Sequence, residues 1–134
     1  MNILIVEDDF YYQDMLAKMV QGWSHDVTCS ENGRSALEKA SAMDFDLFLL
    51  DVFLPDMTAM DLIPRLRVFR PDARVITLTG QSTRELELKL RELGIAYYMA
   101  KPVPASELKG ILDHMGRRKY GRPPCRACPP SAAP

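Results

Sequence analysis

The fold that we expect for this chain follows from the stretch Leu47-Phe48-Leu49-Leu50-Asp51. Its four consecutive apolar residues run directly into an aspartate. An uninterrupted apolar run of this length is typical of a strand that is buried on both faces, as in a parallel sheet. Asp51 then lies at the sheet edge where open α/β sheets bind their ligands. The alternative is a loop aspartate that only caps the next helix.

Outward from this stretch, short apolar runs alternate with segments of helical periodicity. Further strands are predicted at 3–6, 27–29, 75–78 and 95–99, and helices at 12–20, 33–43, 57–68, 82–93 and from 104 onward. Five strands alternating with five helices predict right-handed βαβ units and therefore an α/β fold with a doubly wound parallel sheet. The flavodoxin-like strand order 2-1-3-4-5 is the economical choice, and it places strands 1 and 3 side by side.

Two local features qualify the predicted helices. Pro64 has no amide hydrogen, so we expect the helix that contains it to begin late, near Asp61, or to be kinked. The aromatic run Phe10-Tyr11-Tyr12 at the start of the first helix is interpreted as packing.

Length and composition bound the class of protein. The chain has 134 residues, which suits one domain and is too short for two well-developed cores. No apolar run approaches the roughly 18 residues that cross a bilayer, and the N-terminus does not resemble a signal peptide. We therefore expect a cytoplasmic protein without a membrane partner. Its three cysteines do not make a disulfide framework.

Charge divides the chain into two parts. Residues 1–116 carry 12 Lys/Arg and 18 Asp/Glu, a net charge of −6, whereas residues 117–134 carry five basic residues, no acidic ones and five of the ten prolines. The sequence thus predicts a domain over 1–116 and a disordered, basic, proline-rich tail over 117–134. Cys125 and Cys128 have the spacing of half a zinc site, but no second pair exists. We expect no nucleic-acid binding, because no recognisable DNA-binding helix follows.

The ends of the predicted strands carry the polar residues that suggest chemistry. The residues at four strand ends are Glu7-Asp8-Asp9, Asp51, Thr79-Gly80 and Lys101-Pro102. Carboxylates that converge at one edge repel one another and therefore need a cation. Oxygen ligands without His or Cys favour Mg²⁺ (or Mn²⁺). A metal, an ammonium and a hydroxyl around one carboxylate describe a site for phosphoryl transfer.

These motifs resemble the receiver domains of two-component response regulators, over residues 1–116. The matching segments are Ile3-Leu4-Ile5-Val6-Glu7-Asp8-Asp9, Leu50-Asp51-Val52-Phe53-Leu54-Pro55-Asp56-Met57, Leu78-Thr79-Gly80 and Tyr98-Met99-Ala100-Lys101-Pro102. The resemblance is to the chemotaxis type, in which the receiver stands alone. Each motif is weak by itself, but four of them in order at the expected strand ends are specific.

The resemblance implies a role for each matching residue. Asp51 is the expected phospho-acceptor, and the expected metal ligands are Glu7 (through water), Asp8, Asp51 and the backbone carbonyl of Phe53. Thr79 and Lys101 are expected to hold the phosphoryl group, and Tyr98 to be the aromatic that moves inward on activation. Asp9 is expected to start a helix, and the peptide bond between Lys101 and Pro102 to be cis.

The function implied is a phosphorylation-dependent switch and not an enzyme beyond self-phosphorylation and slow autodephosphorylation. A histidine kinase or phosphotransfer protein is the expected donor, and an unknown downstream protein is expected to bind through helix 4, strand 5 and helix 5. We expect a monomer or a weak dimer. The alternatives are a phosphorylation-independent scaffold, a fragment of a larger regulator and an aspartyl-phosphate hydrolase. Hydrolases of the dehalogenase type have a second acid where Phe53 stands.

Overall fold

The computed structural model describes the backbone of residues 1–121 and the side chains of residues 1–116. The chain divides into two compact units, Met1–Val103 and a second that begins at Pro104. The strands are β1 (Asn2–Val6), β2 (Asp26–Ser30), β3 (Leu47–Asp51), β4 (Arg74–Thr79) and β5 (Tyr97–Ala100). The helices are α1 (Phe10–Gly22), α2 (Gly33–Ala42), α3 (Ala59–Phe69), α4 (Arg84–Glu92) and α5 (Ala105–Gly121).

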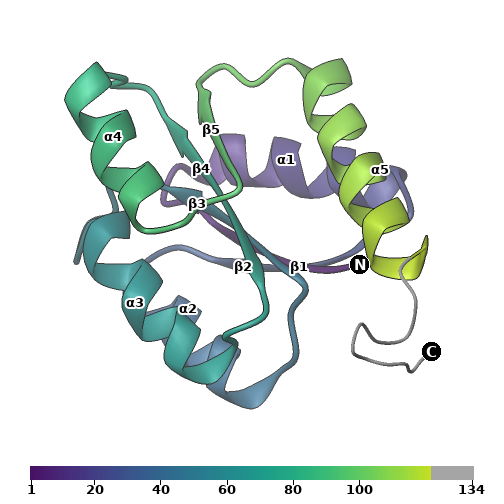
Figure 1. Ribbon diagram of the computed structural model, residues 1–134, viewed down its shortest axis with the longest axis horizontal. Helices are drawn as coiled ribbons and strands as arrows, with labels where there is room; N and C mark the ends of the chain where they lie inside the picture. Colours follow the sequence, from purple (N-terminus) through teal and green to yellow (C-terminus); the bar gives the residue numbers. More distant parts are fainter. Residues whose placement is uncertain (122–134) are drawn as a thin grey trace. The chain divides into compact units, whose positions relative to one another are not determined.

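All five strands form one parallel sheet in the order β2-β1-β3-β4-β5, which confirms the predicted fold. The central strand β3 is buried along its whole length, as its unbroken apolar run predicts. Its two neighbours are β1, whose Val6 is in register with Leu50, and β4, whose Leu78 is in register with Asp51. Because the strands are parallel, their carboxyl ends lie at one edge of the sheet (Figure 1).

Alternate residues of the strands face opposite sides of the sheet. On one side Leu4, Val6, Phe48 and Leu50 share a core with buried residues of α2, α3 and α4. On the other side α1 packs on β1 and β2, and its buried residues are Leu16 and Val20. Figure 1 shows this arrangement of α1 on one face and α2 to α4 on the other. Helices on both faces are what make a parallel sheet stable in water.

The helix with Pro64 begins at Ala59, later than the predicted 57 and close to Asp61, as the late start predicts, and the proline lies inside the helix. Pro64 is exposed, so water can hydrate the carbonyl group that its missing N–H would have bonded. The packing interpretation is wrong for Phe10 and Tyr11, which are 68% and 84% exposed. Only Tyr12 of the aromatic run is half-buried.

The second unit contains α5. The amide of Leu108 donates to the carbonyl of Pro104 at 3.0 Å, so Pro104 immediately precedes the first turn, as the sequence predicts. The helix continues to Gly121 and thus includes residues 117–121, which the sequence assigned to the tail. The rest of the predicted tail, with Cys125 and Cys128, lies outside the described residues, and its disorder stays a prediction.

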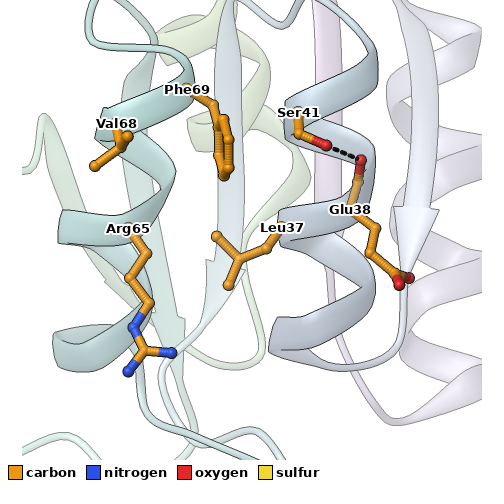
Figure 2. Close-up of a pocket in the computed structure, with 6 residues that line it drawn as sticks. All are labelled: Leu37, Glu38, Ser41, Arg65, Val68 and Phe69. Carbon is orange, nitrogen blue, oxygen red and sulfur yellow. Dashed lines mark hydrogen bonds between the residues drawn. The ribbon is translucent and has the colours of Figure 1, made fainter.

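A hollow of about 430 Å³ lies on the surface between α2 and α3 (Figure 2). Its lining is mostly apolar and consists of Leu37, Glu38, Ser41, Arg65, Val68 and Phe69. None of the residues predicted to carry the chemistry lines it. Within residues 1–121, no helix has the length and apolar character needed to cross a membrane.

Candidate functional site at the carboxyl edge of the sheet

Three acidic residues converge at this edge. Glu7 and Asp8 follow β1, and Asp51 is the last residue of β3, the neighbouring strand. One carboxylate oxygen of each residue lies within 4.8 Å of the others. Glu7 and Asp51 are buried, at 2% and 8% exposure, whereas Asp8 is exposed. The sheet therefore brings together the acids that the sequence predicts to meet.

This acidic cluster fits a hard divalent cation. Its ligand atoms are carboxylate oxygens, and no imidazole or thiolate belongs to the group. Mg²⁺ prefers such ligands and retains several of its own waters, which the exposed side at Asp8 can accommodate. Glu7, Asp8 and Asp51 are thus the residues that could hold the ion. A role for the carbonyl of Phe53 stays a prediction.

Lys101 supplies the positive charge at the site. It follows β5, and its Nζ forms ion pairs with Oε1 of Glu7 and, at 3.3 Å, with Oδ2 of Asp51. Although burial acts to lower the pKa of Lys101, the hydrogen bond from its ammonium to Glu7 and the charge of Asp51 raise it. The ammonium is therefore kept charged between two carboxylates. The bond between Lys101 and Pro102 is cis, as the resemblance implies.

Burial dominates the electrostatics of Glu7. Loss of solvation raises the pKa of this carboxyl to about 7, and the charge of Asp51 contributes in the same direction. The hydrogen bonds from Lys101 and from the amide of Asp9 oppose the rise without cancelling it. Glu7 is therefore poised to exchange a proton near neutral pH when no cation is bound.

Thr79 and Tyr98 lie on neighbouring strands of the same sheet. Thr79 ends β4, is fully buried, and its Oγ1 accepts a hydrogen bond from the amide of Gln81 at 3.0 Å. The hydroxyl still has its own proton to donate. Tyr98 is half-buried, its ring packs against the core, and its hydroxyl donates to Oγ of Ser82 at 2.8 Å. Both residues thus contact the loop between β4 and α4.

Phe53 lies in the loop after β3 and is 43% exposed. The loop is tied at both ends, because the amide of Val52 donates to Leu78 and the amide of Ala59 donates to Val52. Phe53 itself pairs with Thr58 in a single antiparallel bridge. The loop therefore holds an exposed aromatic side chain two residues beyond Asp51.

Sequence reasoning missed the role of Asp56. Its carboxylate accepts hydrogen bonds from the amides of Gly33 and Arg34, at 2.8 and 3.0 Å, and so caps the start of α2. Desolvation acts to raise the pKa of Asp56, but these backbone hydrogen bonds lower it below its usual value. Gly33 also allows the side chain of Met57 to lie close to the start of α2, because a Cβ at position 33 would be 2.5 Å from Sδ of Met57. No local pattern links segments this far apart in the chain.

Asp9 and Tyr12 complete the surroundings of the site. Asp9 caps α1, since its side chain accepts from the amides of Tyr11 and Tyr12, which agrees with the expected helix start. The ring centroid of Tyr12 lies 4.8 Å from Nζ of Lys101, and its hydroxyl accepts from the amide of Val103 at 3.0 Å. The sequence indicated Tyr12 only as a packing residue, within the aromatic run at the start of the first helix.

Comparison with curated proteins finds longer relatives, of which this chain matches only a part. The chain is 34% identical over 122 residues to the DNA-binding transcriptional regulator NtrC of Rhizobium meliloti, covering 91% of this chain and 25% of the relative. It is 36% identical over 118 residues to the probable transcriptional regulatory protein SilR of Salmonella typhimurium, covering 88% and 52%. The chain thus spans between a quarter and about half of the length of these relatives.

Comparison with solved structures supports the same fold. A CheY-like response regulator receiver domain from Methanospirillum hungatei matches with a TM-score of 0.82 and 26% identity, covering 90% of this chain and 98% of that one. The response regulator TrrA from Thermotoga maritima, solved in complex with Mg²⁺-BeF, matches with a TM-score of 0.75 and 26% identity, covering 85% and 97%. The family model of the response regulator receiver domain matches residues 3–113. The chain therefore belongs to the family of response regulator receiver domains.

Proposed function

We propose that this receiver domain is a phosphorylation-dependent switch whose phospho-acceptor is Asp51. Receiver domains are signalling domains that interact with histidine kinases or phosphotransfer proteins and with downstream targets. The observation that carries the proposal is the arrangement around Asp51: a buried carboxylate within 4.8 Å of Glu7 and Asp8, with Lys101 Nζ at 3.3 Å. A carboxylate between acids and an ammonium suits transfer of a phosphoryl group, which carries negative charge itself.

The transfer is a displacement at phosphorus. A carboxylate oxygen of Asp51 forms a new bond to phosphorus while the bond from phosphorus to the histidine nitrogen of the donor breaks. The electron pair of the broken bond goes to that nitrogen, which takes up a proton from solvent. Glu7, Asp8 and Asp51 could hold Mg²⁺ (or Mn²⁺), which would neutralise negative charge on the phosphoryl group.

The residues of this chain have separate tasks in that step. Lys101, now paired with Glu7 and Asp51, can turn its ammonium to the phosphoryl oxygens. The hydroxyl of Thr79 can donate to the same group by a rotation of the buried side chain. Both bonds are charge-assisted, as the present ion pairs of Lys101 are.

We further propose that Tyr98 carries the signal outward. If Thr79 turns toward the phosphoryl group, the space beside it becomes available to the ring of Tyr98, which must then give up its hydrogen bond to Ser82. The two states need to differ by only a few kcal/mol for one modification to reverse their populations. The readout would be a changed surface of α4 and β5, to which a downstream protein binds.

Phosphorylation with a small donor tests the proposal. Acetyl phosphate with Mg²⁺ should add the mass of one phosphoryl group to the intact protein, and peptide mapping after reductive trapping should place it on Asp51. A protein that gains no mass under these conditions would instead be a phosphorylation-independent scaffold. A phosphoryl group found on another residue would refute the assignment of the acceptor.

An aspartyl-phosphate hydrolase is not favoured. The relatives are regulators, and Phe53 stands where the dehalogenase type has its second acid. An exposed phenylalanine has no group that could activate water. We propose that loss of the phosphoryl group is slow autodephosphorylation, governed by how readily water passes Phe53 and Gln81.

A further inference from the structure

Tyr12 is held at a fixed place beside the acidic cluster. It is the third residue of α1, and its amide donates to Oδ1 of Asp9, the residue that caps the helix. The amide of Asp9 in turn donates to Oε2 of Glu7 at 3.1 Å. A short chain of hydrogen bonds thus ties the backbone of Tyr12 to a residue of the site.

The side chain of Tyr12 reaches across to the end of β5 and contacts it twice. Nζ of Lys101 lies 4.8 Å from the centroid of its ring, within the range of a cation–π interaction. Its hydroxyl accepts a hydrogen bond from the amide of Val103 at 3.0 Å. The two contacts fall on either side of Pro102, so they hold both the lysine head group and the backbone that carries it.

We infer that Tyr12 is a positioning residue for Lys101 in phosphoryl transfer. A lysine ammonium is a compact charge on a flexible four-carbon stem, so its position depends on what surrounds it. Here Glu7 and Asp51 bind the ammonium from the acidic side, and the ring of Tyr12 contacts it as a third group. When the phosphoryl group arrives, the ammonium exchanges its contacts with the carboxylates for contacts with phosphoryl oxygens. The ring of Tyr12 keeps the ammonium near Asp51 during this exchange.

The inference rests on the proposed function, because it assigns Tyr12 a task in the same reaction. Replacing Tyr12 by leucine removes both contacts, whereas replacing it by phenylalanine keeps the ring and removes only the hydroxyl. Tyr11→Leu is the matched control, since Tyr11 is the adjacent tyrosine of the same helix and is 84% exposed. Rates of phosphorylation of Asp51 by acetyl phosphate and Mg²⁺ are compared after each variant is shown by circular dichroism to be folded.

Tyr12→Leu should slow phosphorylation about fivefold, the effect of a cation–π contact of about 1 kcal/mol at a half-buried site. Tyr12→Phe should retain a rate closer to that of the wild type, and Tyr11→Leu should equal the wild type. In a Lys101→Ala background the change at Tyr12 should have no further effect, because a residue that acts through the lysine has nothing left to position. A wild-type rate in Tyr12→Leu, or a fivefold loss that persists without Lys101, would overturn the inference.

NMR separates this inference from the proposed function. The ring of Tyr12 should shift the proton signals of the Lys101 ε-methylene group, and the shift should persist in Tyr12→Phe and disappear in Tyr12→Leu. If the wild-type protein takes up no phosphoryl group, the proposed function fails whatever the NMR result. If the wild type is phosphorylated but no ring-dependent shift is seen, only the role of Tyr12 fails. If Tyr12→Leu does not fold, the comparison of Tyr12→Phe with Tyr12→Met replaces it.

Discussion

Replacing Asp51 by asparagine is the sharpest test of the acidic site. The variant keeps the size and shape of the side chain but replaces the carboxylate that is proposed to attack phosphorus by an amide, which is not a nucleophile at neutral pH. Phosphorylation by acetyl phosphate and Mg²⁺ should therefore be lost, as measured by intact mass. The fold should survive, and the structure indicates how much its stability can change.

Two opposing charge effects at Asp51 set that change. Lys101 Nζ is 3.3 Å from Oδ2 of Asp51, and such a pair attracts by about 5 kcal/mol at an effective dielectric of about 20. Oxygens of Glu7 and Asp8 lie within 4.8 Å, where each ionised neighbour repels by about 3.5 kcal/mol at the same dielectric. Solvent screens the repulsion from Asp8, which is exposed. Removal of the charge on Asp51 also removes the cost of desolvating that charge. The lost attraction to Lys101 is therefore nearly cancelled by the lost repulsion and the lost desolvation cost.

The free energy of unfolding of Asp51→Asn should thus stay within about 2 kcal/mol of the wild type, unchanged or higher, in urea denaturation without metal. Asp9→Asn is the matched control. It removes a charge at the same edge, and asparagine caps a helix as well as aspartate does, so phosphorylation should persist. Phosphorylation of Asp51→Asn at the wild-type rate would place the acceptor elsewhere. A loss of more than about 4 kcal/mol would mean that attraction, not repulsion, dominates the cluster.

Three further outcomes are expected. Mg²⁺ binding should be weak in the free protein, because few protein oxygens are available, and calorimetry should show it weakened more than about tenfold in Asp8→Ala. An unchanged affinity would refute Asp8 as a ligand. Burial raises the pKa of Glu7 from 4.5 to about 7, so the folded state binds a proton that the unfolded chain has already released. This stabilisation of the metal-free protein should be complete below about pH 4.5 and lost as the pH rises through about 7, and Glu7→Gln should flatten the profile, whereas an identical profile would contradict the cause. Tyr98→Ala should leave phosphorylation of Asp51 nearly intact but remove the phosphorylation-dependent NMR shift changes in α4; loss of phosphorylation with those changes retained would place Tyr98 in the site and not in the switch.

The fold, and the edge of the sheet at which the site lies, could be predicted from the sequence. The apolar run of β3 is typical of a strand buried on both faces, and a parallel sheet collects the ends of its strands at one edge. Glu7, Asp51 and Lys101 were therefore predicted to meet, and the structure shows that they do. Such a prediction succeeds because it needs only the order of the strands and the positions where they end.

The exposure of individual side chains was harder to predict. Phe10 and Tyr11 are as apolar or aromatic as core residues, yet they lie on the solvent side at the start of α1. Pro64 lies inside its helix, although proline is disfavoured in a helix interior. In both cases the surrounding packing, and not the residue type, determines the outcome, because tertiary contacts can outweigh local preferences, including the roughly 3 kcal/mol that proline costs in a helix interior.

Contacts between segments distant in the chain could not be predicted and are known only from the packed structure. Asp56 caps α2 from the loop after β3, and Tyr12 contacts Lys101 and Val103 from the first helix. Neither pairing has a spacing or periodicity that a sequence could display, since each depends on how close two distant segments come in the folded chain. The sequence determines which residues reach that edge, whereas only the packed structure determines which of their side chains touch, because a contact of a few ångströms depends on the placement of every element between them.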